Sequence, residues 1–206
     1  MLDLNKLINC FFMDYLPSHK RIEIYNEFSL QYEMGIFLRH HLDESKYKVQ
    51  FERNVRYFFE HISTKETTKK EIDIAIFDDN KSEKYAIELK FPRNGMVPET
   101  MYAFVKDIRF MEELKELGFS QTACVSLVDD SAFYMSSDKY KKGGIYQFFR
   151  EGVAFTKEPI YKPTGNKEGE DIPYIKLDRV HEAIKWQDLE TKNSEPARKF
   201  YVITIK

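Results

Sequence analysis

Two consecutive strand-like runs, both carrying charged residues in an apolar pattern, most constrain how this chain can fold. Residues 71–77 read EIDIAIF, residues 85–91 read YAIELKF, and the turn-like residues 78–83 join them. Two short strands separated by such a turn predict an antiparallel hairpin. In a compact hairpin Asp73 and Glu88 would come close together.

The charged side chains of this hairpin should gather on one face of the sheet. Successive side chains of a strand point to opposite faces, so Glu88 and Lys90 must point the same way. By the same rule Asp73 shares its face with Glu71 and Ala75, and the opposite face carries Ile72, Ile74 and Ile76. Two carboxylates and an ammonium group on one polar face suit a hard divalent cation and a positioned nucleophile. The pattern therefore predicts a metal-dependent phosphodiesterase site.

The composition is that of a folded protein with a strongly solvated surface. The chain has 206 residues, of which 42% are hydrophobic and 32% are charged, and its formal net charge is −2. This length fits one domain. A net charge near zero does not indicate a general attraction to nucleic acid, so contacts with phosphate would need a local basic cleft.

Cysteine content and the N-terminal residues both favour a cytoplasmic protein. Cys10 and Cys124 are the only cysteines, and their separation matches neither a metal-ligand spacing nor a disulfide framework. Residues 1–15 lack a basic start, and no run of 18 apolar residues occurs. We therefore expect neither a secretion signal nor a membrane span.

Hydrophobic periodicity predicts a mixed α/β core. Helical spacing of apolar residues and strand-like alternation each recur along the first two thirds of the chain, and residues 121–128 are a continuous apolar run of buried-strand length. Helices are expected at residues 4–15, 26–42 and 98–117, and strands at residues 47–57, 71–77, 85–91 and 121–128. The first three strands would form an antiparallel meander, and the helix that follows them would cross over to a parallel strand.

The last third of the chain is less regular. Polar or glycine-containing loops are expected at residues 136–144 and 159–171, and strands at residues 145–150, 172–177 and 199–205. We interpret residues 1–206 as a single domain. Its core would be residues 26–130, and residues 131–206 would form a β-rich extension.

The proposed chemistry assigns a role to each polar group of the hairpin. Asp73, Glu88 and the main-chain carbonyl of Leu89 are the candidate ligands of Mg²⁺, with Mn²⁺ as a substitute, because magnesium prefers oxygen ligands. Lys90 would orient or help to deprotonate the attacking water and stabilise negative charge on the phosphoryl group. A neutral lysine would require a lowered pKa, which a sequence does not show.

These residues and the predicted elements resemble the PD-(D/E)XK nuclease superfamily. The resemblance implies a restriction endonuclease-like α/β fold with a helix, a three-strand antiparallel meander, a crossover helix and a further strand. Its metal-binding acids match Asp73 and Glu88, its lysine matches Lys90, and its helical acid best matches Glu33. The proline that often precedes the first acid is replaced by Ile72, as in relatives with an aliphatic residue there.

One further substrate contact is assigned on the same resemblance, and others on the basic character of the residues. Residues 31–39 and 88–95 are similar to blocks found in bacterial members of the superfamily. The superfamily sometimes places a substrate-contacting residue on the crossover helix, where Lys106 lies. Other candidate contacts with phosphate are Arg93, Lys141 and Lys142.

The resemblance implies a magnesium-dependent endonuclease that acts on DNA, in restriction, phage defence or repair. Cutting of both strands by so small a chain would require two active sites, which favours a homodimer with the N-terminal amphipathic helix as its interface.

Several alternatives remain open at this point. Glu88 and Lys90 could form a simple same-face ion pair, and Glu27 competes with Glu33 for the role of the helical acid. The same fold could serve as a nucleic-acid-binding or interaction module without catalysis, or as a nuclease subunit that needs a targeting partner.

Overall fold

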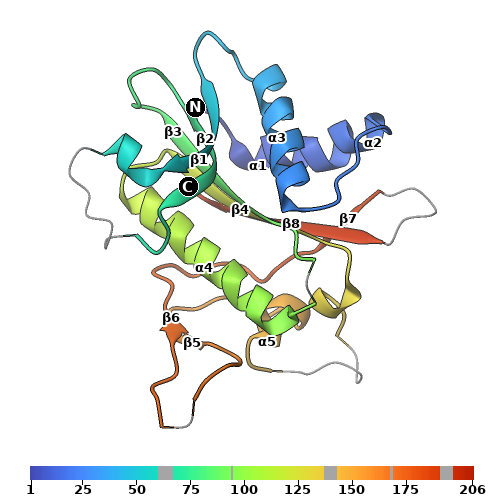
Figure 1. Cartoon of the computed structure of the whole chain (residues 1–206), viewed down its shortest axis with the longest axis vertical. Helices are drawn as coiled ribbons and strands as arrows, with labels where there is room; N and C mark the ends of the chain where they lie inside the picture. Colours follow the sequence, from blue (N-terminus) through green and yellow to red (C-terminus); the bar gives the residue numbers. More distant parts are fainter. Residues whose placement is uncertain (60–66, 94, 137–142, 168, 191–196) are drawn as a thin grey trace.

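A mixed six-stranded sheet forms the centre of the protein (Figure 1). The computed structural model describes residues 1–59, 67–93, 95–136, 143–167, 169–190 and 197–206. The strands, in their order across the sheet, are β1 (Lys48–Asn54), β2 (Glu71–Phe77), β3 (Lys84–Lys90), β4 (Gln121–Val128), β8 (Arg198–Ile205) and β7 (Gln187–Leu189). Strands β3 and β4 are parallel, and all other neighbours in this sheet are antiparallel.

The order of elements in the predicted core is confirmed. Helix α3 (Glu27–His41) precedes the antiparallel meander β1–β2–β3, and helix α4 (Val97–Glu116) leads to the parallel strand β4. A parallel neighbour requires such a crossover, because a tight turn can join only antiparallel strands. The chain therefore has an α/β fold around a sheet with both parallel and antiparallel strands.

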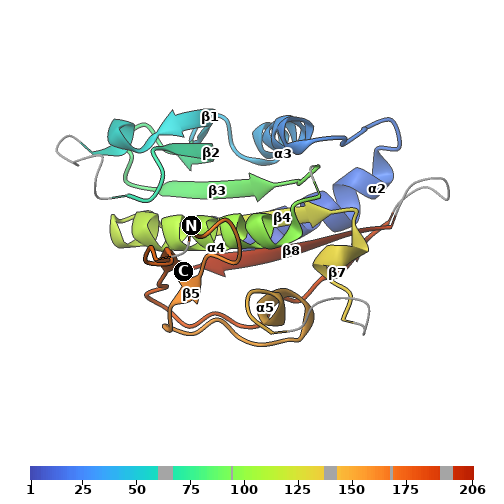
Figure 2. The same cartoon turned by 60° about the horizontal axis from the view of Figure 1, so that its bottom comes forward.

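Helices cover both faces of the sheet (Figure 2). One face carries α3 and a helical segment made of α1 (Leu4–Cys10), a π-helical turn (Phe11–Tyr15) and α2 (Leu16–Ser18). The other face carries α4 and α5 (Tyr146–Arg150), beside a separate two-stranded sheet of β5 (Ile160–Tyr161) and β6 (Tyr174–Ile175). Because β4 lies between two layers, all eight of its residues are buried.

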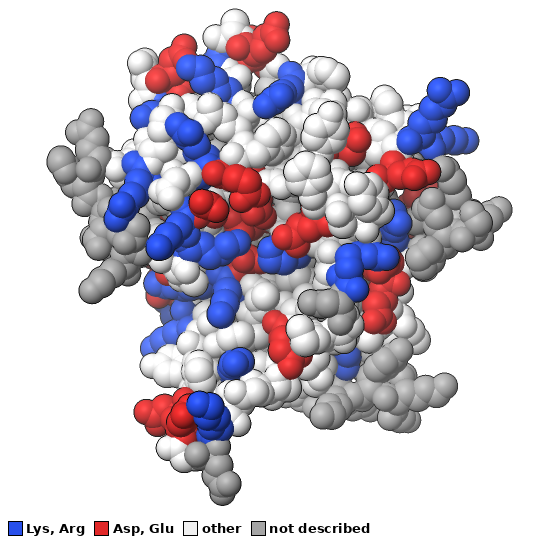
Figure 3. Space-filling view, in the orientation of Figure 1, with Lys and Arg blue, Asp and Glu red and all other residues white. Residues whose placement is uncertain are grey.

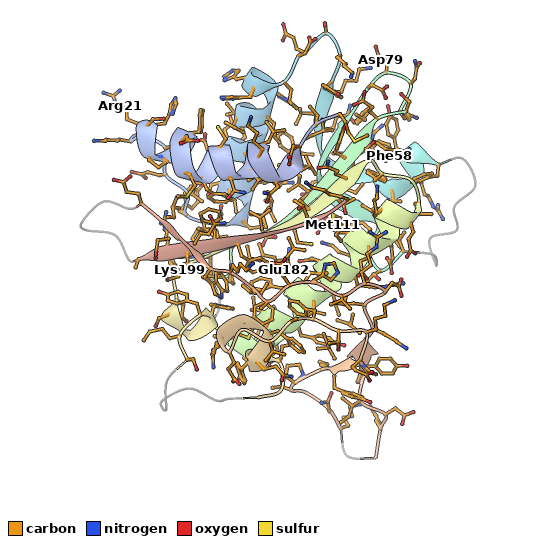
Figure 4. The ribbon with its side chains drawn as sticks, turned by 180° about the vertical axis from the view of Figure 1, so that it is seen from behind. Arg21, Phe58, Asp79, Met111, Glu182 and Lys199 are labelled. Carbon is orange, nitrogen blue, oxygen red and sulfur yellow. The ribbon has the colours of Figure 1, made fainter. Side chains whose placement is uncertain are left out.

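The N-terminal helix is part of the core. Its apolar residues Leu4, Ile8, Phe11 and Phe12 are at most 1% exposed. The ring of Phe12 stacks on that of Phe200 in β8, with 4.2 Å between their centroids. Figure 4 shows this helix along the sheet above β8. Its apolar side is therefore not available as the dimer interface that the sequence analysis assigned to it.

The helical segment at the N-terminus also runs past its predicted end. It was expected to stop before Pro17, but α2 includes that residue. The preceding π-helical turn shifts the hydrogen-bonding pattern just before the proline, whose missing N–H would otherwise interrupt the helix.

The C-terminal third differs most from its predicted elements. Residues 145–150 were expected to be a strand, but Tyr146–Arg150 is helical. Phe148 and Phe149 are both buried in the same cluster against α4, which adjacent residues of a strand would not achieve because they point to opposite faces. Of the expected strand at residues 172–177, only Tyr174–Ile175 is paired. Strand β8 is confirmed, and it completes the central sheet.

Helix α4 also holds the C-terminal segment through a buried carboxylate. Glu112 is fully buried and accepts hydrogen bonds from the backbone amides of Asp178 and Arg179, at 2.8 and 2.9 Å. His181 Nε2 lies 2.8 Å from the same carboxylate. Buried carboxylates are tolerated where hydrogen bonds replace water, so this contact fixes residues 178–181 on α4.

In the parts of the chain that the structure describes, no helix has the length and apolar character needed to cross a membrane.

The buried aromatic contact at the N-terminus leads to a stability prediction. Phe12→Ala should lower the free energy of unfolding by about 3–5 kcal/mol, because it leaves a cavity against Phe200. Its neighbour Met13 is 50% exposed, and Met13→Ala should change stability by no more than about 0.5 kcal/mol. Urea unfolding followed by circular dichroism measures both. Equal stabilities of the two variants would contradict the assignment of this helix to the core.

Candidate functional site

The two acids of the motif hairpin meet where β2 and β3 begin to separate. The last backbone pair between these strands is Ile74 with Ile87, and Asp73 and Glu88 follow it. The Asp73 carboxylate accepts a hydrogen bond from the Leu89 amide at 2.7 Å, and the Glu88 carboxylate accepts one from the Asp73 amide at 3.2 Å. Each acid thus bonds to the backbone of the opposite strand, and the predicted proximity of the two acids is confirmed.

The strict alternation predicted for β2 fails at Asp73. Ile72 was expected on the face of Ile74, but it packs in the cluster on the α4 side, whereas Ile74 packs on the α3 side. Opposite Asp73 in strand β1, Glu52 has a φ of 48°, which strains a residue other than glycine. This local distortion of the sheet frees the backbone of Asp73 for contacts with side chains.

A glutamine of α3 uses that freed backbone. Gln31 is 8% exposed, and its Nε2 donates to the Asp73 carbonyl and to the Glu52 carboxylate, both at 2.7 Å. An amide nitrogen offers two donors, and both are satisfied here. Gln31 therefore joins helix α3 to both β1 and β2 beside the strained residue Glu52.

The N-terminus of α3 brings Glu27 to the end of β3. Asn26 caps the helix by accepting from the Ser29 amide at 2.8 Å, and the Ser29 hydroxyl accepts from the Asn26 amide at 3.0 Å. Glu27 is the first residue of the helix, where the helix dipole favours a negative charge. Its carboxylate accepts from Lys90 Nζ at 3.1 Å and from the Phe91 amide at 3.2 Å.

The Lys90 ammonium lies between α3 and α4. Besides the Glu27 contact, its Nζ donates to the Leu89 carbonyl at 3.0 Å and lies 3.8 Å from Asp107 Oδ2. The side chain is 21% exposed, so most of its surface is removed from water. The Leu89 carbonyl, predicted as a metal ligand, therefore faces the same space as the lysine.

A second lysine enters the site from the segment before β2. Lys69 Nζ bonds to the Glu88 carboxylate and donates to Asp107 Oδ1 at 3.2 Å. The preceding residue, Thr68, fixes this segment on α4, because its amide and hydroxyl both donate to the Glu113 carboxylate at 2.6 Å. Lys69 thus joins the acids of β3 and α4.

The site carries more negative than positive charge when every group is ionised. Four carboxylates face two ammonium groups, an excess of two negative charges, and the groups are Glu27, Asp73, Glu88, Asp107, Lys69 and Lys90. Glu88 and Asp107 are buried, but Figure 3 shows other acidic side chains at the surface near the centre of the view, bordered by lysines and arginines over α4. A divalent cation would neutralise the excess.

Burial and this crowding of like charges change the pKa of each acid. Burial raises the pKa of Asp73 to about 6, although Lys90 and the Leu89 amide oppose the change. Burial, reinforced by the charges of Asp73 and Asp107, raises the pKa of Glu88 well above its usual range. Burial likewise raises the pKa of Asp107. All three carboxylates therefore bind protons more tightly than they would in water.

Both lysines stay charged at neutral pH. Burial lowers the pKa of Lys90, but the carboxylates of Asp107, Glu27 and Asp73 outweigh it and hold that pKa above its usual value. Lys69 behaves in the same way beside Asp107 and Glu88. The structure therefore favours Lys90 as a cation that orients groups and stabilises charge rather than as a proton acceptor.

The donor set suits a hard cation, although the lysines now fill the space among the acids. All candidate ligands are oxygens, and Asp107 Oδ2 is buried without a hydrogen-bond partner. Among the described residues, no three acidic, histidine or cysteine side chains are arranged as a ready metal site. Lys69 lies between Glu88 and Asp107, so a bound cation would have to displace its ammonium group.

The other predicted residues lie at different distances from this cluster. Glu33 is half-buried and its side chain makes no hydrogen bond or ion pair with any described residue, so the structure places Glu27 rather than Glu33 beside the lysine. Arg93 pairs with Asp129 and lies over the ring of Phe91, 5.0 Å from its centroid.

Three predicted substrate contacts remain. Lys106 is exposed on α4, next to Asp107 in sequence, and its Nζ lies 5.5 Å from the centroid of the Tyr102 ring. Lys141 and Lys142 lie outside the described residues.

Sequence reasoning gave no place in the site to Gln31, Asp107 or Lys69, and it gave Glu27 only as an alternative to Glu33. Gln31 and Asp107 have a detectable signal, since each is a polar residue within the apolar stripe of a helix. Glu27 lies one turn before Gln31 and so shares its face. Lys69 has no such signal, because only the folded position of its segment directs it into the site.

Comparisons of the chain with models of known protein families, with curated proteins and with solved structures find no match. The geometry of the site is therefore the basis for any functional conclusion.

The raised pKa of Asp73 leads to a prediction on pH and stability. The pKa of Asp73 rises from 3.8 to about 6 on folding, so the folded protein binds this proton more tightly than the unfolded chain does. The proton on Asp73 therefore stabilises the fold fully below about pH 4, and this stabilisation is lost as pH rises through about 6. The loss should be about 3 kcal/mol. Asp73→Asn cannot titrate, so its stability relative to the wild type should increase by that amount between about pH 4 and pH 8.

Urea unfolding in the presence of EDTA, repeated across this pH range, measures the difference. Glu71→Gln in the same strand, where Glu71 is exposed, is the matched control and should follow the wild type. If the Asp73→Asn and wild-type curves stay parallel, Asp73 titrates as an ordinary exposed acid and the prediction is wrong.

Proposed function

We propose that this protein is a metal-dependent nuclease that hydrolyses phosphodiester bonds, with DNA as its substrate and Mg²⁺ as its cofactor. The observation that carries the proposal is the convergence of Asp73, Glu88, the Leu89 carbonyl and Lys90 at the diverging ends of two strands. The excess negative charge of the cluster supports a divalent cation. The phosphodiester is a substrate that such a cation and a lysine can activate together.

The arrangement of elements supports a place in the PD-(D/E)XK superfamily. Helix α3, the meander β1–β2–β3, helix α4 and the parallel strand β4 follow in the order that the resemblance implies. The two acids lie on the second and third strands of the meander and the helical acid on the first helix of that core. In this proposal Glu27 takes the role first assigned to Glu33.

Each side chain has a role that follows from its position. Asp73, Glu88 and the Leu89 carbonyl would hold the cation, which supplies stabilisation of the charge that grows on the phosphoryl oxygens. Lys90, positively charged and held by Glu27 and Asp107, orients the attacking water and stabilises the same charge. Asp107 lies close enough to both lysines to keep them pointed into the site.

One observation favours a second candidate function. The Lys69 ammonium already contacts Glu88 and Asp107, so the cluster could serve as a buried ion-pair network without any metal. The protein would then be a nucleic-acid-binding or interaction module that has the nuclease fold without its activity. Metal binding distinguishes the two functions.

The proposal predicts cleavage that depends on metal and on the motif residues. Supercoiled plasmid and labelled single strands should be cut with Mg²⁺ or Mn²⁺ and not with EDTA. Asp73→Asn, Glu88→Gln and Lys90→Met should each lower the rate by at least about 100-fold, because each removes a ligand or a charge needed in the transition state. Glu71→Gln is the matched control on β2 and should cut like the wild type.

Calorimetric titration with Mg²⁺ complements this assay. The wild type should bind the metal, and Asp73→Asn and Glu88→Gln should bind it much more weakly. A folded wild type that neither cuts nor binds Mg²⁺ would sink the nuclease proposal and leave the binding module. Metal binding without cutting would indicate a nuclease subunit that requires a partner.

The position of Glu27 leads to a separate prediction. Glu27→Gln should lower the cleavage rate by about 10- to 100-fold, the usual effect of removing a group that orients an active-site residue. Glu33→Gln, on the same helix, should leave the rate unchanged within about twofold. Steady-state cleavage of a labelled oligonucleotide compares the two, and a larger loss for Glu33→Gln would restore the original assignment.

A further inference from the structure

A basic hollow lies next to the candidate site, between α4 and the sheet β5–β6. It has a volume of about 660 Å³. Helix α4 forms one wall, with Glu99, Tyr102, Lys106 and Arg109 as its charged and aromatic side chains. The opposite wall is formed by β6 and the residues next to β5 and β6, with Lys162, Tyr174 and Lys176. Thr68 lies at the edge of the hollow. Volumes of this size hold small organic groups.

The three lysines of the hollow form no close ion pair with a carboxylate of the described residues. Lys106, Lys162 and Lys176 make no ion pair with any described residue, whereas Arg109 is committed to Asp178 and Glu113. Lysines that line one hollow from its two walls repel each other and gain from a bound anion. The hollow therefore offers positive charge that the fold itself does not use.

One acid lies within the hollow, and it is already engaged. Glu99 accepts a hydrogen bond from the Thr164 hydroxyl, and this bond, with help from Lys162, lowers its pKa. Glu99 therefore offsets one lysine charge, that of Lys162, and leaves Lys106 and Lys176 without a carboxylate close by in the hollow. Figure 3 shows the resulting concentration of lysines and arginines over α4.

An exposed aromatic side chain lies on the β6 wall of the hollow. Tyr174 lines the hollow and is 58% exposed, and Tyr161 lies beside it with 5.8 Å between ring centroids. Free lysines interleaved with an exposed tyrosine are the combination that binds single-stranded nucleic acid, since lysines contact phosphates and the ring stacks on a base. A hollow of this volume holds a group of drug-like size and is too small to enclose a duplex.

The hollow and the acidic site share two stretches of chain. On α4, Lys106 lines the hollow and the next residue, Asp107, belongs to the site. Before β2, Thr68 lines the hollow and the next residue, Lys69, reaches Glu88. The hollow therefore directly adjoins the acidic site.

We propose that the hollow between α4 and β5–β6 binds a single nucleic-acid strand, with phosphates on Lys106, Lys162 and Lys176 and a base stacked on Tyr174. The proposal deepens the nuclease function by naming a single strand as the form of the substrate that reaches the acids. Only that last step rests on the proposed function, because binding in the hollow needs no cleavage.

Fluorescence anisotropy with the full chain in EDTA tests the binding directly. The probes are labelled strands of about 15 nucleotides, as DNA and as RNA of the same sequence, and the matching DNA duplex. Each single strand that binds should bind more tightly than the duplex. Replacing all three lysines by glutamine should weaken binding by about tenfold or more and reduce the slope of log affinity against log salt by about 2.

Two matched controls accompany these variants. Lys6→Gln, Lys20→Gln and Arg21→Gln together make the same charge change on the α1–α2 side of the protein, where Figure 4 shows Arg21, and should leave binding unchanged. Tyr174→Ala should weaken binding by about 5- to 100-fold, while Tyr174→Phe keeps the ring and should bind like the wild type.

The outcomes separate this proposal from the nuclease function. Binding that is equal in wild type and lysine variant, or stronger for the duplex, overturns the hollow as a strand site even if the protein cuts DNA. Binding that depends on the lysines and Tyr174 supports the hollow even if no cleavage is found, in which case only the nuclease function fails.

Discussion

A cluster of carboxylates is buried at the ends of β2 and β3, and the surrounding structure must compensate for their lost hydration. A buried carboxylate loses its water and must be compensated by hydrogen bonds or by opposite charge. Backbone amides of Asp73 and Leu89 provide the first, and Lys69 and Lys90 provide the second. The compensation is incomplete, since the cluster would carry an excess of two negative charges with every group ionised, and its buried acids have raised pKa values instead. This residual field distinguishes the cluster from an ordinary set of ion pairs.

Helix α4 links the cluster to the rest of the molecule. Its buried side packs on the sheet, and the same helix supplies Asp107 to the site, Lys106 to the basic hollow and Glu112 to the C-terminal segment. Changes along this helix therefore reach the acids and the hollow together. Negative charge at the acids and positive charge in the hollow lie on neighbouring residues, an arrangement that suits a substrate with phosphates along its length and one bond to be cut.

Much of the core and half of the site could be predicted from residue patterns. The helices α3 and α4 follow from the helical spacing of apolar residues and strand β4 from an unbroken apolar run, and the proximity of Asp73 and Glu88 follows from the pairing of two strands in a hairpin. The strand predicted at residues 145–150 failed, because aromatic residues suit both a strand and a short buried helix. Which of these forms depends on the packing partner, here α4, and that partner is distant in sequence.

The sequence by itself determined which residue types can do chemistry and how the nearest of them are spaced, because the pairing of two strands in a hairpin is local in the chain. It determined the pair Asp73 and Glu88, with Lys90 beside them. Only the tertiary structure decided that Glu27 rather than Glu33 reaches Lys90, and that Lys69 and Asp107 join the acids. These contacts join segments far apart in the chain, and their geometry depends on how α3 and α4 pack against opposite faces of one sheet.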